Sequence, residues 1–329
     1  MTSCLLLAAG NGTRMRTDYP KVLAEVLNVP MLAWVLGSVI ECGIKNKCVV
    51  TGYASDKIKS FLELNGYDCE TSFQSERRGT AHAVMSAREF LNRNLEGDVL
   101  ILGGDSPFID AFTITSAYKQ HKREENAVTI ISADLDNPFG YGRIIRNSYN
   151  DVCEIVEERE ANKEQKKITE INSGAYWFNV RHLLDAIGSI SASSLSGELY
   201  LTSIVSIFIK SGFNVGAFCS PDCTIALGAN TPEELEKLND IAKRKLISSF
   251  ISRGVKITDF DKVSISKNVE IGEGTTILSD VIINSFTKIG RNCTIGPGIV
   301  LSGEVIPDNT NLVCLESQNY RSEEVKYAT

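Results

Sequence analysis

The sequence predicts an α/β protein in which a doubly wound, mostly parallel, Rossmann-like sheet is followed by a short left-handed parallel β-helix. Three observations support this fold. Apolar strand-like runs alternate with amphipathic helical runs over residues 1–228, a charged helical segment follows at 229–252, and apolar residues then recur every six positions. Such alternation is typical of a parallel sheet with helices on both faces. The expected parts are therefore a sheet domain at 1–228, a helical linker arm at 229–252, a β-helix at 253–310 and a C-terminal tail at 311–329.

Short apolar runs mark the strands expected in the sheet domain. They are Ser3–Ala8, Cys48–Thr51, Asp98–Leu102, Ala127–Ser132, Arg143–Arg146, Cys153–Val156 and Ala175–Phe178. Amphipathic spacing predicts helices at Met31–Cys42, Thr80–Leu91, Ala111–Lys122 and Glu198–Lys210. Ligands of such sheets bind beyond the carboxyl ends of the strands. The residues that follow each strand are therefore the first candidates for a site.

The linker and the repeat have their own signals. Thr231 is a plausible N-cap and Pro232 a first helical residue, so a helix is expected over Pro232–Phe250. The residues of the six-residue repeat are Ile265, Ile271, Ile277, Ile283, Ile289, Ile295 and Leu301. Three hexads make one coil of a parallel β-helix, with the apolar residues stacked inside. We expect little more than two coils, with the repeat ending near Pro307.

The composition excludes several classes of protein. The chain has 329 residues, of which 43% are hydrophobic and 23% charged, as in a folded protein of about two domains. A net charge of −7 disfavours a general nucleic-acid binder. No apolar run approaches the ~18 residues of a membrane-spanning helix, and the N-terminus lacks the basic segment of a secretion signal. Nine scattered cysteines indicate reduced thiols and a cytoplasmic location, with neither zinc nor a membrane expected.

The densest motif directly follows the first strand. It reads Leu7-Ala8-Ala9-Gly10-Asn11-Gly12-Thr13-Arg14-Met15 and is followed by Pro20-Lys21. A glycine-rich turn after a strand lets backbone N–H groups approach a phosphate, and no Gly-Lys-Ser/Thr is present to make it a Walker A loop. Arg14 and Lys21 add two cations suited to phosphate oxygens. A surface turn with two solvated charges is the alternative, which the flanking pattern disfavours.

Seven further motifs follow. In order they are Gln74…Gly79-Thr80-Ala81-His82-Ala83, Gly104-Asp105, Gly140-Tyr141-Gly142-Arg143, Ile155-Val156-Glu157-Glu158, Glu170-Ile171-Asn172-Ser173-Gly174, Gly197-Glu198-Leu199-Tyr200-Leu201-Thr202 and Gly228-Ala229-Asn230. With the glycine-rich turn, they resemble the sugar-1-phosphate nucleotidyltransferases, and more closely the bifunctional bacterial N-acetylglucosamine-1-phosphate uridyltransferase/glucosamine-1-phosphate acetyltransferase family. The resemblance covers residues 3 to about 300. It implies UTP and a sugar-1-phosphate as substrates, UDP-N-acetylglucosamine and pyrophosphate as products, and one or two Mg²⁺ ions as cofactor.

The resemblance also assigns roles to residues. Arg14 and Lys21 are catalytic, and Asp105 and Asn230 are metal ligands. The residues assigned to nucleotide binding are Leu7, Ala8, Ala9, Gly10, Gly12, Thr13, Gln74, Gly79, Thr80 and Asp105. Those assigned to sugar binding are Gly140, Glu157, Asn172, Tyr200 and Thr202. Without the resemblance, Asp105 fits a strand-terminating turn as well as a metal ligand. A Gln amide can flip, so Gln74 alone does not separate uracil from cytosine. His82 is interpreted as a helix-face residue, since a single histidine without partners is a weak catalytic signal.

The chemistry implied needs no general base. The second pKa of a phosphate monoester is about 6, so a sugar phosphate is largely dianionic at neutral pH. What it requires is alignment on the α-phosphate and neutralisation of the leaving pyrophosphate. Four positions depart from the usual family pattern. This chain has Gly103 where the family usually has Tyr, Glu160 in place of Asp, Ser173 in place of Thr and Ser203 in place of Asp. Gly103 removes an aromatic wall near the nucleotide and Ser203 a carboxylate near the sugar, which leaves base and sugar specificity open.

The histidines bear on the second activity of this family. His82, His121 and His182 all lie in the sheet domain, whereas the family's acetyltransferase uses a histidine in a long β-helix. We therefore expect no acetyltransferase activity. The short β-helix is expected to be an oligomerisation platform, with a homotrimer or a monomer as the open alternatives. The rival functions are a nucleotidyltransferase of another base or sugar specificity and a non-catalytic sugar-nucleotide sensor.

Overall fold

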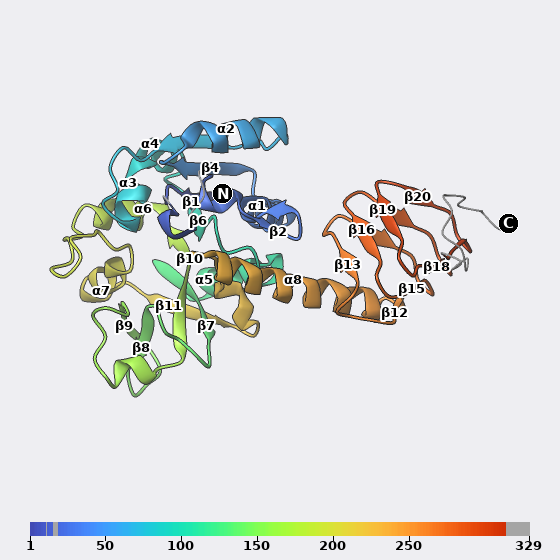
Figure 1. The fold of residues 1–329 in the computed structure, drawn as a ribbon. Coiled ribbons are helices and arrows are strands. Elements are labelled where there is room, and N and C mark those ends of the chain that lie inside the picture. The colour runs from blue at the N-terminus through green and yellow to red at the C-terminus, as the bar shows by residue number, and fades with distance from the viewer. Residues whose placement is uncertain (11, 16–18, 314–329) are drawn as a thin grey trace. The chain divides into compact units, whose positions relative to one another are not determined.

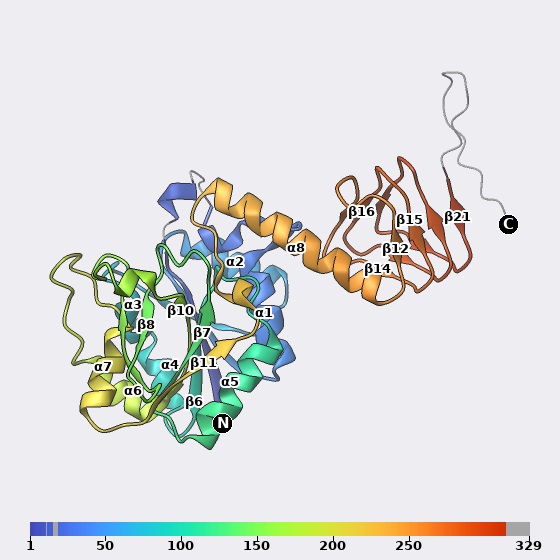
Figure 2. The same cartoon turned by 90° about the horizontal axis from the view of Figure 1, so that it is seen from below.

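A computed structural model of the protein describes residues 1–10, 12–15 and 19–313, apart from the side chain of Thr13. The chain divides into two compact units. The first comprises Met1–Ala24 and Pro30–Glu234, and the second comprises Glu25–Val29 and the chain from Leu235 onward. Figures 1 and 2 show the course of the chain within each unit.

The first unit is built on a nine-stranded, mostly parallel sheet. The strands of its main path are, in spatial order, β11 (Val215–Ser220), β7 (Val128–Asp134), β10 (Glu170–Asn179), β6 (Asp98–Gly103), β1 (Thr2–Ala8), β4 (Asn46–Thr51) and β5 (Glu70–Phe73). Only β10 runs antiparallel to its neighbours on this path. A side hairpin of β8 (Arg143–Arg146) and β9 (Val152–Val156) extends from β10. This confirms the predicted mostly parallel α/β sheet.

Helices cover both faces of this sheet (Figure 1). One face carries α1 (Met31–Glu41), α2 (Ser55–Leu64) and α5 (Ala111–Arg123), and the other carries α3 (Thr80–Ser86), α4 (Arg88–Arg93), α6 (Val180–Ile187) and α7 (Ser203–Lys210). Successive strand side chains point to opposite faces. In β1, Leu5 accordingly packs in the core under α3 and α4, while Leu6 packs in the core under α1 and α2. Both are fully buried, as expected of a doubly wound sheet.

Two predicted helices differ from the observed ones. The helix expected over Thr80–Leu91 is interrupted at Ala87, where α3 ends and α4 begins. The helix expected over Glu198–Lys210 begins only at Ser203. The preceding segment is tied to α3 instead: the N–H of Leu199 donates to the carbonyl of Arg78 at 2.6 Å, and that of Leu201 to the hydroxyl of Thr80 at 2.9 Å. These tertiary contacts hold residues 199–201 in a non-helical conformation.

Several elements escape the sequence pattern altogether. These are α2, α6, β5 and β11, the hairpin of β2 (Glu25–Val26) and β3 (Val29–Pro30), and the short 3₁₀ helices η1 (Thr13–Met15), η2 (Lys21–Leu23), η3 (Gln165–Lys167) and η4 (Cys223–Ala226). Strand β5 is an edge strand with mostly exposed side chains. It therefore lacks the apolar run by which buried strands are recognised.

The second unit contains most of α8 (Pro232–Ser252) and a parallel β-helix. Its strands are β12 (Lys256–Ile257), β13 (Ser264–Ile265), β14 (Glu270–Ile271), β15 (Thr276–Ile277), β16 (Ile282–Asn284), β17 (Lys288–Ile289), β18 (Thr294–Ile295), β19 (Val300–Ser302), β20 (Val305–Ile306) and β21 (Asn311–Leu312). They form three sheets, β12-β15-β18-β21, β13-β16-β19 and β14-β17-β20. Ile247 and Phe250 of α8 join the stacked isoleucines in one buried core.

The β-helix is longer than the repeat predicts. Its described strands make three coils and begin a fourth, where little more than two coils were expected. The strict six-residue period does not extend to the two ends of the β-helix, because Ile257 precedes Ile265 by eight residues and Ile306 follows Leu301 by five. The repeat also continues past Pro307 to β21. Of the tail expected at 311–329, residues 314–329 lie outside the described residues.

Two smaller features complete the fold. The hydroxyl of Thr231 accepts a hydrogen bond from the N–H of Glu234 at 3.2 Å, which confirms its predicted capping of α8. In the second unit, the hairpin loop bonds to Asn239 through the N–H of Leu27 at 2.8 Å and to Ser266 through Asn28 at 3.2 Å. No described helix combines the length and apolar character needed to cross a membrane.

Candidate active site

The glycine-rich turn lies at the carboxyl edge of the sheet, beside the turn that follows β6. Strands β1 and β6 are parallel neighbours, with Leu7 opposite Gly103. The N–H of Gly104 donates to the carbonyl of Leu7 at 2.9 Å. Apart from its chain neighbours, no atom of the described residues lies within 4 Å of the place where a Cβ would stand at Gly10, which leaves space beside this backbone. The side chains of Ala8 and Ala9 are buried, which leaves the backbone to make any contact with a ligand at these positions.

Lys21 is held close to this turn by Gly12. Gly12 has a φ of +57°, and a Cβ at this residue would lie 2.7 Å from the Cβ of Lys21. Glycine permits both the left-handed conformation and the close approach. The ammonium group of Lys21 forms an ion pair with Asp105 and donates to the side-chain oxygen of Asn230 at 2.7 Å. The two predicted metal ligands therefore converge on one cation.

Gly228 brings Asn230 toward Asp105. A Cβ at Gly228 would lie 2.9 Å from the backbone oxygen of Asp105, so the two loops are in direct backbone contact. The N–H of Asn230 donates to the carboxylate of Glu234 at 2.6 Å, which fixes this loop to the start of α8. Loops from three distant parts of the sequence thus supply Lys21, Asp105 and Asn230.

This pair of oxygen donors fits a divalent cation such as Mg²⁺. A carboxylate and an amide oxygen are hard ligands, and they already gather around a positive charge. Among the described residues there is no cluster of three or more His, Cys, Asp or Glu that would complete a protein cage. Mg²⁺ usually keeps several waters and binds one or two carboxylates together with substrate phosphates. The carboxylate and amide oxygens of Asp105 and Asn230 match this mode of Mg²⁺ binding.

Arg14 lies at the adjoining surface. Its side chain is exposed and lines a hollow together with Thr231, Pro232 and Glu233. These residues directly follow Asn230 in the sequence. Arg14 is thereby positioned next to the loop that carries the second proposed metal ligand, with its guanidinium accessible to an incoming anion.

Gln74 and the start of α3 form the part of the site predicted to hold the base. Gln74 follows β5 and is only 6% exposed. Its side-chain nitrogen lies 3.3 Å from the carbonyl oxygen of Gly79 and 3.1 Å from Nδ1 of His82. Gly79 has a φ of +107°, and a Cβ there would lie 2.5 Å from the carbonyl oxygen of Leu199. Gln74 and the Gly79 segment, both predicted to hold the base, therefore lie together, with His82 as an additional partner of Gln74.

Glu157, Asn172 and Thr202 form the part of the site predicted to hold the sugar. The hydroxyl of Thr202 donates to the carboxylate of Glu157 at 2.7 Å. Asn172 donates to the hydroxyl of Tyr176 at 2.6 Å. Gly142 lies between them, since a Cβ there would stand 3.5 Å from Glu157 and 3.7 Å from Asn172. Glu157, directly after β9, and Asn172 of β10 thus meet at one glycine, and Thr202 before α7 joins them through Glu157.

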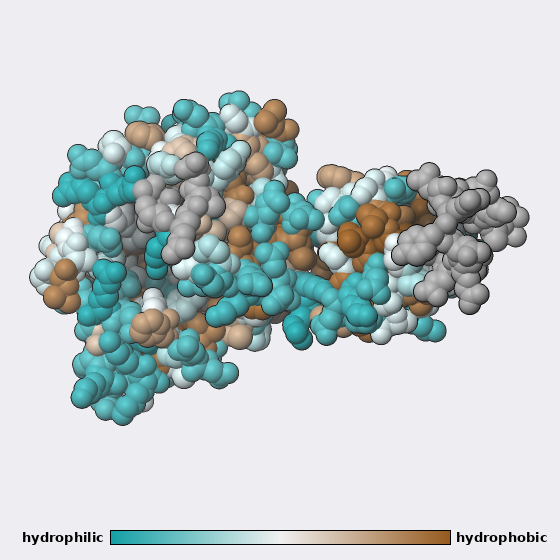
Figure 3. Space-filling view, in the orientation of Figure 1, coloured by the Kyte–Doolittle hydropathy of each residue, from teal (hydrophilic) through white to brown (hydrophobic). Residues whose placement is uncertain are grey.

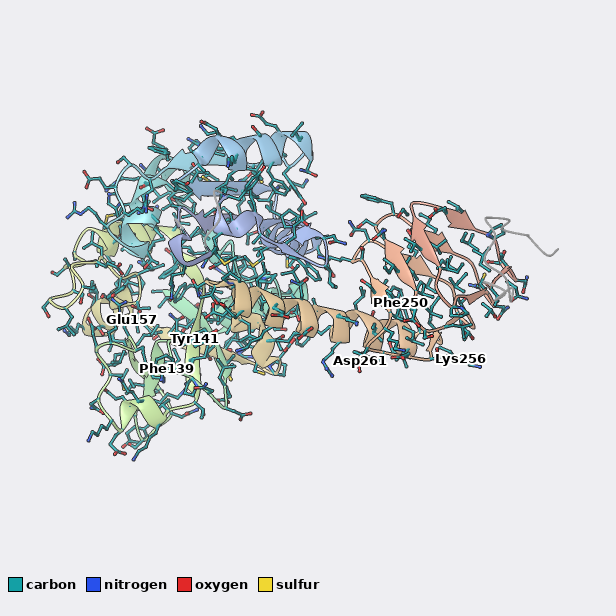
Figure 4. All side chains as sticks on the ribbon, in the orientation of Figure 1. Phe139, Tyr141, Glu157, Phe250, Lys256 and Asp261 are labelled. Atoms are coloured by element: carbon teal, nitrogen blue, oxygen red, sulfur yellow. The ribbon has the colours of Figure 1, made fainter. Side chains whose placement is uncertain are left out.

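Burial perturbs the titration of this cluster. It raises the pKa of Glu157, and the negative charges of Glu160 and Glu198 add to the rise, against the hydrogen bond from Thr202. Burial also raises the pKa of Tyr141, and the negative charges of Glu234 and Asp105 add to this rise. Figure 4 labels Glu157 and Tyr141 on neighbouring segments of the first unit. Perturbed carboxyl groups of this kind are enriched at functional sites.

Three participants of the site were not identified from the sequence. Tyr176 lies in the predicted strand but was given no role, although it is buried against Asn172. Arg143 is 1% exposed and pairs with Glu158 at 2.7 Å, which anchors the loop that carries Gly140. Glu158 also accepts from the N–H of Gly140 at 3.2 Å. Arg143 and Glu158 each lie at the end of one of the motifs quoted above. Their membership of these motifs is the sequence signal that could have identified them.

Comparison with known proteins places the chain among transferases. Residues 3–224 match the family described as nucleotidyl transferase, and residues 268–303 match the bacterial transferase hexapeptide (six repeats). The chain is 38% identical over 309 residues to the bifunctional protein GlmU of Caldanaerobacter subterraneus subsp. tengcongensis, covering 94% of this chain and 66% of that protein. It is 35% identical over 308 residues to the bifunctional protein GlmU of Clostridioides difficile, with the same coverage of 94% and 66%.

A solved structure supports the fold. It is that of a putative glucose-1-phosphate thymidylyltransferase from Bacillus anthracis in complex with a sucrose, with a TM-score of 0.61 and 21% identity. The match covers 74% of this chain and 95% of that chain. At this identity the likeness concerns the fold. The present chain spans slightly less than two thirds of the length of the first curated relative.

Replacement of Glu157 by Gln is expected to raise stability at neutral pH. The folded-state pKa of Glu157 lies above its ordinary value, so below that ordinary value both states are protonated and the group has no effect. As pH rises, the unfolded state loses its proton first, which disfavours the fold. The gain in melting temperature of Glu157→Gln should therefore be present at pH 7 and shrink as pH falls toward about 4.

Glu158→Gln serves as the matched comparison. Although burial opposes the shift, hydrogen bonds from Arg143 and Gly140 lower the pKa of Glu158. Its contribution is stabilising above the unfolded pKa and is lost as pH falls through the folded pKa. Glu158→Gln should therefore lower the melting temperature at pH 7. A lower melting temperature for both variants would contradict the assignment of Glu157.

Proposed function

The chain belongs to the nucleotidyl transferase family, and from this membership and the site we propose that it joins UTP to N-acetylglucosamine-1-phosphate, giving UDP-N-acetylglucosamine and pyrophosphate. The observation that carries the proposal is the meeting of Lys21, Asp105 and Asn230 at the carboxyl edge of the sheet. A positive charge and two metal-type oxygen donors are what a triphosphate site requires. The relatives named as bifunctional GlmU proteins support the choice of substrates.

The reaction is an in-line displacement. An oxygen of the sugar phosphate attacks the α-phosphorus of UTP, the bond from that phosphorus to the β-bridging oxygen breaks, and pyrophosphate leaves with the electron pair. The attacking phosphate is already largely dianionic, since its second pKa is about 6. No side chain has to remove a proton, so the site acts by alignment and by charge neutralisation.

The residues of the site divide this work. Lys21 and Arg14 neutralise phosphate oxygens, and the open backbone at Gly10 receives the triphosphate. Asp105 and Asn230 would hold Mg²⁺, one or two ions, which when bound neutralises charge on the phosphates. Glu157 and Asn172, with Gly140, Tyr200 and Thr202 beside them, bind the sugar through hydroxyl-directed hydrogen bonds. Gln74, with Gly79 and Thr80, binds the base.

The relatives are named as bifunctional proteins, and we propose only uridylyl transfer, not acetyl transfer, for this chain. All three histidines of the sequence, His82, His121 and His182, lie in the first unit. The β-helix residues thus include no imidazole that could act as a base toward an amino group. We therefore infer that this chain transfers the uridylyl group and not the acetyl group.

The β-helix is proposed to assemble the chain into a homotrimer. Hexapeptide repeats are often oligomeric, and this β-helix carries exposed apolar side chains. Ile282 and Val300 stand opposite each other on β16 and β19, with exposures of 43% and 60%. Phe286 and Val305 are more than 70% exposed in the same unit, and Figure 3 shows an apolar patch on this surface. Patches of this kind often mark protein interfaces.

The compartment is also part of the proposal. The described cysteines are all free, and thiols persist in reducing compartments. We assign the enzyme to the cytoplasm, with soluble substrates and neither a nucleic acid nor a membrane as partner.

Pyrophosphate release from the full chain tests the proposed reaction. We expect release with UTP and N-acetylglucosamine-1-phosphate in the presence of Mg²⁺, and loss of release when Mg²⁺ is removed with a chelator. CTP, dTTP and other sugar phosphates form the comparison panel. Release that requires one of these instead would replace the proposed substrates, and no release from any pair would refute the proposed activity.

Lys21→Ala and Arg14→Ala are each expected to lower kcat by about 10²–10³ in this assay, the scale for loss of one preorganised charge donor. Lys45→Ala is the matched control, because Lys45 is an exposed lysine of the same unit outside the proposed site. An unchanged kcat in either site variant would remove that residue from the mechanism.

Acetyl transfer provides a separate prediction. Purified protein incubated with acetyl-CoA and glucosamine-1-phosphate is expected to form no N-acetylglucosamine-1-phosphate, because the β-helix of this chain has no histidine. Free coenzyme A released above the enzyme-free rate, together with the acetylated product, would overturn the restriction to one activity.

Charges placed in the apolar patch should prevent assembly. Wild-type protein is expected to scatter light as a trimer of 36.0 kDa chains, and the double variant Ile282→Asp, Val300→Asp as a single chain, because buried unpaired carboxylates disfavour the interface. Lys256→Asp is the control, since Lys256 is exposed on β12 in another of the three sheets. A monomeric wild type, or a double variant that stays trimeric, would contradict this use of the patch.

A further inference from the structure

The side-chain amide of Gln74 has a defined orientation. Its nitrogen lies 3.3 Å from the carbonyl oxygen of Gly79. A backbone carbonyl only accepts hydrogen bonds, so the group that faces it must be the NH₂ and not the oxygen. The opposite orientation would place two carbonyl oxygens against each other. The orientation therefore follows from an unambiguous neighbour.

His82 engages the second hydrogen of the same NH₂ group. Its Nδ1 lies 3.1 Å from the Gln74 nitrogen. Because that nitrogen is a donor, Nδ1 must be the unprotonated ring atom, and the neutral imidazole carries its proton on Nε2. Both amide hydrogens of Gln74 are then engaged inside the protein. The remaining group, the oxygen Oε1, can only accept.

Both anchors come from one short and rigid segment. Gly79 is in direct backbone contact with Leu199, and the N–H of Ala81 donates to the carbonyl of Leu199 at 2.9 Å. These contacts fix the carbonyl of Gly79 and the first turn of α3, from which His82 projects. Gln74 itself is held by its own N–H, which donates to the carbonyl of Thr51 at 2.8 Å. Both acceptors are therefore held in place, and turning the amide over would set its oxygen against each of them.

We propose that His82 is a positioning residue for base specificity: it holds Gln74 as a pure acceptor, so that the site takes pyrimidines with an N3–H, such as uracil, and rejects cytosine. The N3 of uracil is a donor, which pairs with an acceptor. The N3 of cytosine is itself an acceptor and would leave two lone pairs facing each other in a nearly buried position. This inference rests on the proposed function only in that Gln74 contacts the base.

Binding of UTP and CTP to the full chain, measured by calorimetry with Mg²⁺ present, tests the inference without requiring turnover. Wild-type protein is expected to bind UTP about 100-fold more tightly than CTP, the scale of leaving a buried acceptor unpaired. His82→Leu removes one of the two anchors. It is expected to lower the UTP:CTP ratio about tenfold, the effect of losing one hydrogen bond, mainly through weaker UTP binding.

Two variants keep the result interpretable. In His82→Asn, the side-chain oxygen stands near the place of Nδ1 and can accept from Gln74, so the ratio should stay within about threefold of wild type. Ser86→Ala removes the hydroxyl that donates to the backbone carbonyl of His82 at 2.9 Å without touching Gln74, and should leave the ratio unchanged. A melting curve for each variant separates misfolding from lost selectivity.

Each outcome decides the proposal. An unchanged ratio in a folded His82→Leu variant, or equal binding of UTP and CTP by wild type, overturns it. A protein that selects UTP in binding through His82 but releases no pyrophosphate supports this inference while refuting the proposed activity. Where turnover is present, the effect of His82→Leu should appear in the KM for UTP with kcat nearly unchanged, because His82 does not touch the reacting phosphates.

Discussion

The contact of Lys21 with both Asp105 and Asn230 is the interaction around which the site is organised. Its three members come from loops more than 80 residues apart, and none of them is brought there by local structure. The parallel pairing of β1 with β6 sets the first two loops side by side. Backbone contacts at Gly12 and Gly228 then close the remaining gaps. An ammonium group among these oxygens offsets the repulsion that a carboxylate and an amide oxygen would otherwise exert on each other.

At the end of the site proposed to hold the sugar, the residue proposed to function there lowers stability instead of adding to it. Glu157 is buried with its pKa raised, and other acidic groups stand near it. A carboxylate in that position disfavours folding at neutral pH, and its hydrogen bond from Thr202 offsets only part of the cost. A neutral side chain would fold at least as well. The carboxylate is therefore best explained by a partner that arrives from solution with hydroxyl groups to donate.

The sequence predicts some of this arrangement well and some not at all, for physical reasons. The buried strands and the hexad repeat are recognisable because burial imposes a regular apolar pattern on them. The edge strand β5 and the coils at either end of the β-helix lack that regularity. The segment before α7 was predicted as helix because its apolar spacing suits one. Its N–H groups are engaged by Arg78 and Thr80 instead, a tertiary contact that spacing does not encode. The side-chain contact between Gln74 and His82 is likewise a tertiary contact that residue spacing does not encode.

Gly103 shows how one departure from the family pattern reaches the centre of the site. The sequence suggests only that an aromatic wall is absent. In the structure, a Cβ at Gly103 would lie 2.8 Å from a carboxylate oxygen of Asp105. Any larger side chain would oblige that carboxylate to turn. Asp105 contacts Lys21, and Lys21 contacts Asn230, so the position of the carboxylate is coupled to both. The absence of a side chain at Gly103 therefore permits the observed position of the proposed metal ligand.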